Sequence, residues 1–190
     1  MSWQAALSLG IPALVAVIGY LTTQRSNLRL NERKDRLERI NGQLSDLYGP
    51  LFATSTASDA AWRTFRSQYR PGGGYWGGTR PPPTPDEEAA WRLWMTTVFM
   101  PLNRQMRDAI VRGAHLLEEE NVPDVLLAVC AHVSAYEAVL KRWEEGDYAV
   151  HTTPLNFPSD ELRDYAGSAV RRLKLEQNRL IRQTTGHSVS

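Results

Sequence analysis

The hydrophobic pattern of this chain opens with a long uninterrupted apolar stretch. Residues 3–23, WQAALSLGIPALVAVIGYLTT, contain no charged side chain. A helix of this length, rising about 1.5 Å per residue, spans roughly 30 Å, which is the thickness of the hydrocarbon core of a bilayer. Trp3 and Tyr20 lie near its two ends, where ring side chains favour the headgroup region. The pattern predicts a transmembrane anchor over residues 1–24.

Charge gives this anchor an orientation. Residues 25–39 carry six basic and three acidic side chains, whereas Met1-Ser2 carries no basic side chain. The positive-inside rule therefore predicts that the amino terminus lies outside and that the chain after Gln24 lies in the cytoplasm. A cleaved signal peptide would need a basic segment before the apolar stretch. The single cysteine, Cys130, suits a reducing compartment.

Beyond the anchor, apolar residues recur in a seven-residue pattern that predicts an amphipathic stalk over residues 25–49. The stripe consists of Leu30, Leu37, Ile40, Leu44, Leu47 and Leu51. Spacings of three and four place these residues on one face of a helix. Two alternatives follow for this face. Either Leu37, Ile40, Leu44 and Leu47 form a coiled-coil seam with a second copy, or the stripe docks on the domain that follows.

The pattern over residues 50–184 predicts a helical bundle. Four amphipathic stretches are expected to be helices: residues 50–69, 86–120, 123–146 and 159–183. Gly49-Pro50 is expected to interrupt the stalk, and Pro101 is expected to kink the second helix. No alternating strand pattern of useful length occurs. We therefore predict an all-α protein: a transmembrane helix, an amphipathic stalk and a roughly four-helix up-and-down bundle, with a flexible tail at residues 185–190.

Three finer expectations concern these helices. The buried face of the second helix is expected to include Trp91, Trp94, Val98, Leu102, Met106, Ala109 and Leu116, and this helix is expected to end in Glu118-Glu119-Glu120. In the third helix, Glu137 lies four residues before Lys141, which is a favourable spacing for a surface ion pair.

A loop rich in glycine and proline interrupts the bundle at residues 70–85, RPGGGYWGGTRPPPTP. Such a composition predicts a surface loop rather than a helix or strand. Tyr75 and Trp76 stand out because a simple linker does not need large aromatic side chains. They are expected to cap the bundle, to touch lipid headgroups or to meet a partner, and they are our second candidate interaction surface.

Residues that could carry chemistry are sparse. None of the four histidines has a second histidine at the four-residue spacing that lets one helix face hold zinc. Cys130 and His132 point about 200° apart on a helix and cannot share a metal. The glycine pairs in the loop lack the Lys-Ser/Thr of a phosphate-binding loop. His132 and Tyr136 are spaced to hydrogen-bond, as a structural pair or as a proton-transfer dyad. We predict no catalytic, cofactor or metal site.

Composition limits the partner classes. Apolar residues make up 42% and charged residues 23% of the 190 residues, which is typical of a folded protein. The 22 basic and 21 acidic side chains nearly cancel, so no overall field gathers nucleic acid and no nucleic-acid partner is expected. The expected partners are the lipid bilayer together with a second copy or a cytosolic protein.

Three stretches carry a family resemblance: QLSDLYGPL from Gln43, HVSAY from His132 leading to WEEGDY at Trp143, and Phe157-Pro158 leading to LKLEQ at Leu173. Together they resemble small bacterial membrane proteins of uncharacterised function with one amino-terminal span and a helical cytosolic body. The resemblance implies a single-pass protein of the bacterial inner membrane. It implies no catalytic residues.

These observations favour a non-enzymatic, membrane-anchored interaction or scaffold module that self-associates through its stalk or binds a cytosolic protein. One alternative is a membrane effector of a bacterial stress or defence system, whose span would cluster through Ala6 and Gly10. The other alternative is an enzyme whose site involves His132, Tyr136 or buried carboxylates.

Overall fold

The computed structural model describes the backbone of residues 3–72, 75–76 and 81–185, and the side chains of residues 19–72, 75–76 and 81–183. Over these residues the regular structure is helical and includes no strand. The all-α prediction is therefore confirmed. The chain divides into two compact units: residues 1–40 with 177–190, and residues 41–176.

The first unit contains most of the long helix α1 (Trp3–Gly42) and the end of α6 (Ser159–Thr185). Side chains of α1 from residue 19 to residue 36 are exposed, apart from the half-buried Arg33. No helix within the described part of the chain has an apolar stretch long enough to cross a membrane. Residues 1–18 of the predicted anchor lie outside the described side chains, and residues 186–190 of the predicted tail lie outside the described residues.

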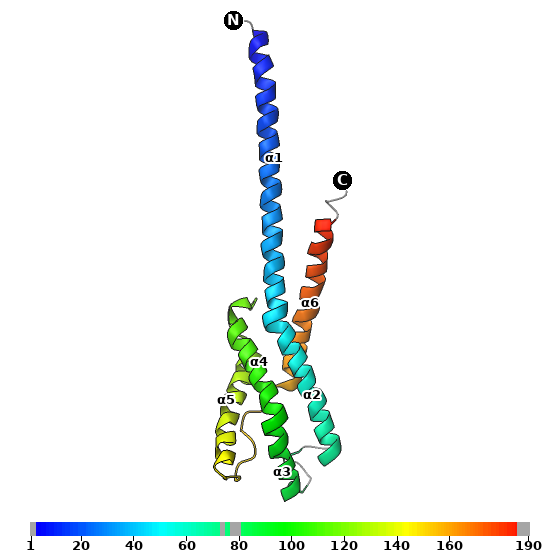
Figure 1. Cartoon of the computed structure of the whole chain (residues 1–190), viewed down its shortest axis with the longest axis vertical. Helices are drawn as coiled ribbons and strands as arrows, with labels where there is room; N and C mark the ends of the chain where they lie inside the picture. The colour runs from blue at the N-terminus through cyan, green and yellow to red at the C-terminus, as the bar shows by residue number, and fades with distance from the viewer. Residues whose placement is uncertain (1–2, 73–74, 77–80, 186–190) are drawn as a thin grey trace. The chain divides into compact units, whose positions relative to one another are not determined.

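The second unit is a helical bundle, as the sequence predicts. Its first rod joins η1 (Gln43–Tyr48) to α2 (Gly49–Tyr69). Its second rod joins α3 (Pro85–Trp94), η2 (Met95–Phe99) and α4 (Met100–Gly113). Helix α5 (Asp124–Glu144) and the first part of α6 follow. Helix α4 packs between α2 and α5, and these rods run in alternating directions (Figure 1).

The structure corrects the expected interruption at Gly49-Pro50, because the helix continues through these residues. The helix also continues through Pro101, where a kink and not a break was expected. In each case a short π-helical segment ends two residues before the proline. The Gly49 N–H donates to the Leu44 oxygen, and the Met100 N–H donates to the Met95 oxygen, each five residues back. A proline has no backbone N–H and cannot donate the next hydrogen bond of an α-helix. The wider π turn before the proline lets the helix continue despite this missing donor.

The π segment η2 also changes which residues face the core. The α-helical period predicts Val98 and Leu102 inside, but both are only half-buried, whereas Phe99 and Asn103 are buried. A wider turn contains an additional residue and therefore shifts the buried stripe by one position. Met106 and Ala109 are buried as expected.

The second rod also ends before Glu118-Glu119-Glu120, where the sequence predicted its end. Helix α4 stops at Gly113, and the single turn η3 (Ala114–Leu116) follows. Glu118 pairs with Arg172, and Glu119 accepts a hydrogen bond from the Tyr165 hydroxyl at 3.1 Å. These acids therefore bind α6 side chains from an irregular segment and do not form a helix end.

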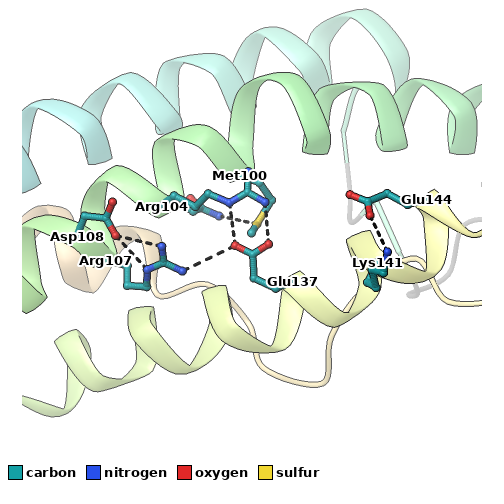
Figure 2. Close-up of polar contacts among 8 residues, drawn as sticks. Met100, Arg104, Arg107, Asp108, Glu137, Lys141 and Glu144 are labelled. Carbon is teal, nitrogen blue, oxygen red and sulfur yellow. Dashed lines mark hydrogen bonds and ion pairs between the residues drawn. The ribbon is translucent and has the colours of Figure 1, made fainter.

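Polar contacts join α4 to α5 (Figure 2). The Arg104 guanidinium donates twice to the Glu137 carboxylate, both times at 2.7 Å, and Arg107 approaches the same carboxylate at 3.7 Å. The hydrogen bonds from Arg104 lower the pKa of Glu137. The predicted Glu137–Lys141 pair is wrong, because the planar arginine of the neighbouring helix offers a two-point match that a lysine lacks. Lys141 pairs with Glu144 and Glu145 instead.

Candidate functional site

An aromatic cluster occupies the end of the second unit where α2, the glycine/proline loop and α3 meet. Its centre is Phe65, which is fully buried. Six aromatic rings have centroids between 5.0 and 6.0 Å from that of Phe65: Trp62, Tyr69, Tyr75, Trp91, Trp94 and Phe99. Pairs at these separations add attraction beyond the burial of their area. Trp62, Trp91 and Phe99 of this cluster form one wall of the cavity described below.

Tyr75, one of the two candidate interaction residues of the loop, lies inside this cluster and not on the surface. Its side chain is only 3% exposed, and its hydroxyl donates to the Glu87 backbone oxygen at 2.5 Å. Burial raises the pKa of Tyr75 to about 12. The buried Arg70 holds Glu87 at 3.1 Å, and Glu87 in turn completes a capping box with Thr84. Tyr75 thus caps the bundle.

Trp76, the second loop candidate, lies at the border of a cavity. Its ring stacks on that of His151, with centroids 4.8 Å apart and planes at 10°. The side chain is half-buried, and its Nε1 atom is buried with no hydrogen-bond partner among the described residues. A buried donor without a partner is uncommon, so this edge of the cavity has unused hydrogen-bonding capacity.

The irregular segment between α5 and α6 also lines the cavity, and aromatic donors hold it. The Trp91 Nε1–H and the Tyr136 hydroxyl both donate to the His151 backbone oxygen, at 2.9 and 2.6 Å. The Trp143 Nε1–H donates to the Val150 oxygen at 2.8 Å. These donors satisfy backbone acceptors that a segment without secondary structure cannot pair internally.

His132 lies on the buried face of α5 and is 7% exposed. Its Nδ1 lies 2.6 Å from the Leu155 oxygen. A carbonyl only accepts, so Nδ1 carries the proton and Nε2 has the lone pair. Burial lowers the pKa of His132, which favours the neutral ring. The rings of His132 and Tyr136 are 5.4 Å apart, but each hydrogen-bonds to the segment after α5. The predicted hydrogen bond between them is therefore wrong.

Between these walls lies a cavity of about 360 Å³. Its floor is formed by buried side chains of α2, η2, α4 and α5: Ser55, Met95, Phe99, Asn103, His132 and Tyr136. Its rim includes the exposed residues Thr152, Leu155, Asn156 and Ser159. Trp62, Trp76 and Trp91 also line it. Sequence reasoning singled out three of the lining residues, Trp76, His132 and Tyr136, but missed the cavity because its residues come from separate segments without a common motif.

The stalk candidates lie elsewhere. Ile40 and Leu47 are buried, whereas Leu37 and Leu44 are half-buried. A Cβ atom added to Gly113 of α4 would lie 3.0 Å from both Cβ and Cδ1 of Leu47. Leu47 therefore packs within its own chain, as the docking alternative expected for this end of the stripe. None of the four stalk candidates lines the cavity.

Metal and thiol chemistry find little support in the described part of the chain. No group of three or more His, Cys, Asp or Glu side chains there is close enough together to hold a metal ion. Cys130 is half-buried, and burial raises the pKa of its thiol, which disfavours the reactive thiolate.

No protein-family model, curated protein or solved structure matches this chain. Its function is therefore inferred from the residues and their geometry.

Proposed function

We propose that this chain is a membrane-anchored helical module that acts by binding, with its amino terminus outside and its helical body in the cytoplasm of a bacterium. The observation that carries the proposal is the change in charge near residue 24. Residues 3–23 have no charged side chain, and residues 25–39 have six cations against three acids. An uncharged stretch of this length fits a bilayer, and the cations that follow it favour the cytoplasmic side.

The proposed partner of the stalk is a second copy of the chain. Leu30 is 41% exposed on α1, and Leu37, seven residues further along the same face, is half-buried. Large aliphatic side chains on a long helix gain free energy when a second helix covers them. Anchoring places two copies in one plane with their stalks parallel, which raises their effective concentration. A weak seam in this part of α1 then suffices for association.

Membrane extraction tests the anchor. The full chain and a chain beginning at Arg25 are expressed in bacteria, and the membranes are washed with alkaline carbonate. We expect the full chain to remain in the pellet and the shortened chain to appear in the supernatant. A reporter that works only in the cytoplasm should be active when it is fused after Ser190, and a reporter that works only in the periplasm should be inactive there. Release of the full chain by carbonate, or a periplasmic carboxyl terminus, would contradict the proposal.

Cross-linking in membranes tests self-association. Leu30→Glu places a charge on the exposed stripe, and Asn31→Glu places the same charge at the neighbouring exposed position. We expect a cross-linked dimer in the parent chain and in Asn31→Glu but not in Leu30→Glu. A dimer that persists in Leu30→Glu contradicts association through this face. A monomeric parent chain contradicts self-association altogether.

A further inference from the structure

We propose that the cavity binds a small, uncharged, planar aromatic compound that carries an N–H or O–H group, and that this group donates a hydrogen bond to Nε2 of His132. The inference goes beyond the membrane proposal and is independent of it. Every residue involved belongs to the second compact unit, residues 41–176.

The size and walls of the cavity favour a flat ring system. A cavity of about 150 Å³ holds one benzene molecule, and this cavity measures about 360 Å³. Two fused rings therefore fit with room for a substituent. The lining includes the rings of Trp62, Trp76, Trp91 and Phe99. Aromatic walls pack against a flat ring in offset-stacked or edge-to-face arrangements, and binding sites for small molecules are commonly lined in this way.

Two buried polar side chains on the floor give the site its chemical preference. The lone pair of His132 Nε2 has no hydrogen-bond donor among the described residues, because the only hydrogen bond of this ring is made by Nδ1. Asn103 is 4% exposed, and its only hydrogen bond there is a long contact of 4.0 Å from Nδ2 to the sulfur of Met100. A ligand with a donor for His132, and a polar edge for Asn103, can hydrogen-bond to both groups when it enters the cavity.

The charges around the cavity argue for a neutral ligand. Among the described residues that line it, Asp59 is the only acid, and none is a lysine or arginine. The Asp59 carboxylate is already paired with Arg63 at 3.0 Å and with Arg163 at 3.1 Å. An anion would find no cation inside, and an organic cation would meet a carboxylate that two arginines already neutralise. Both charged classes would lose hydration without gaining an ion pair.

The ligand can reach the floor through the irregular segment. Thr152, Leu155 and Asn156 line the cavity and are exposed, whereas the floor residues opposite them are buried. The exposed rim gives the ligand a path to the floor while the hydrogen bonds to the oxygens of Val150, His151 and Leu155 stay in place.

Calorimetric titration of the full chain in detergent micelles tests this inference, with indole as the probe. Benzofuran is the matched probe, because it has the same shape but an oxygen in place of the N–H donor. Empty micelles provide the blank for partitioning. We expect indole to bind about tenfold more tightly than benzofuran, the effect of one buried hydrogen bond.

Two pairs of variants locate the binding. Ser58→Phe fills the cavity from α2, and Ala57→Phe adds the same ring at the neighbouring exposed position outside the lining. We expect Ser58→Phe to abolish indole binding and Ala57→Phe to retain it. His132→Asn keeps a donor for the Leu155 oxygen but removes the Nε2 acceptor. It should bind indole and benzofuran equally.

Indole binding that survives in Ser58→Phe, or no heat above the micelle blank, would overturn the proposal and leave the cavity to water. Equal affinity of the parent chain for both probes would overturn the hydrogen bond to His132. If the variants fail to fold, the ¹⁵N resonance of His132 Nε2 in the parent chain decides. It should move upfield with indole and stay in place with benzofuran, and an unchanged resonance with both probes contradicts the assignment.

Discussion

Tyr136 and His151 are joined by a short hydrogen bond: the phenol of α5 donates to the backbone oxygen of the irregular segment at 2.6 Å. Trp91 of α3 donates to the same oxygen at 2.9 Å. One carbonyl therefore ties two helices to the segment that borders the cavity. Tyr136 is almost fully buried, and burial raises the pKa of its hydroxyl, so the donor proton stays in place at physiological pH.

Removal of this donor should loosen the segment without unfolding the bundle. We expect Tyr136→Phe to lower the free energy of unfolding by about 1 kcal/mol, because the His151 oxygen keeps the bond from Trp91. Urea unfolding followed by circular dichroism measures the change. Tyr148→Phe is the control, since the Tyr148 ring is exposed and makes a contact with Arg92 that does not use its hydroxyl. An equal loss in both variants would contradict the assignment.

Two glycines near the start of the second unit should respond to alanine with opposite signs. A Cβ at Gly42 would lie 3.6 Å from a Leu116 methyl, which is ordinary contact, so Gly42→Ala should stabilise the protein by up to about 1 kcal/mol through helix propensity. A Cβ at Gly49 would collide with the Leu44 backbone oxygen. Gly49→Ala should therefore destabilise the protein. Thermal midpoints that move in the same direction would contradict the π-helical turn at Gly49.

The buried His132 should make stability fall with acid. Its pKa is lowered in the folded protein, while the unfolded chain titrates near 6.5. Below that pH the unfolded state binds a proton that the folded state resists, so stability is lost as pH decreases. His132→Asn keeps the donor to Leu155 but does not titrate. We expect the urea midpoint of the parent chain to fall relative to that of His132→Asn when the pH is lowered from 7.5 to 5. Midpoints of the two chains that change in parallel would contradict this.

The contact between Arg104 and Glu137 should couple α4 to α5 only modestly. Both side chains are 38% exposed, so water and salt screen the pair despite its two hydrogen bonds. A double-mutant cycle with Arg104→Gln and Glu137→Gln should give a coupling of less than about 1 kcal/mol that decreases in high salt. A coupling several times larger, or one insensitive to salt, would show that the pair behaves as a buried one.

Local patterns along the sequence predicted the helices well where the signals agreed. Helix α5 lies between Pro123 and Gly146 as expected, and Gly146 has the positive φ of 81° that favours glycine after a helix. The face of α5 from Leu126 to Trp143 is buried. The expected interruption at Gly49-Pro50 was wrong because a π turn depends on packing on both sides of the proline, and no single-sequence signal marks it.

The site was less predictable than the helices. Tyr75 and Trp76 were recognised as unusual, but the loop pattern did not indicate that one ring would be buried and the other would stack on His151. The sequence spacing offered Lys141 as the partner of Glu137, and only the packing of α4 on α5 selects Arg104. The cavity depends on contacts between α2, α4 and α5 that are far apart in the chain, so a pattern of local periodicity does not contain it.

The carbonyls of Val150 and His151 depend on side chains from α3 and α5 for their hydrogen bonds. This segment therefore has no ladder of its own to hold it when the helices separate. We therefore expect the segment to become ordered only after the distant helices have assembled. When the helices begin to separate, a protease should therefore cleave between Gly146 and Ser159 before the helices themselves unfold.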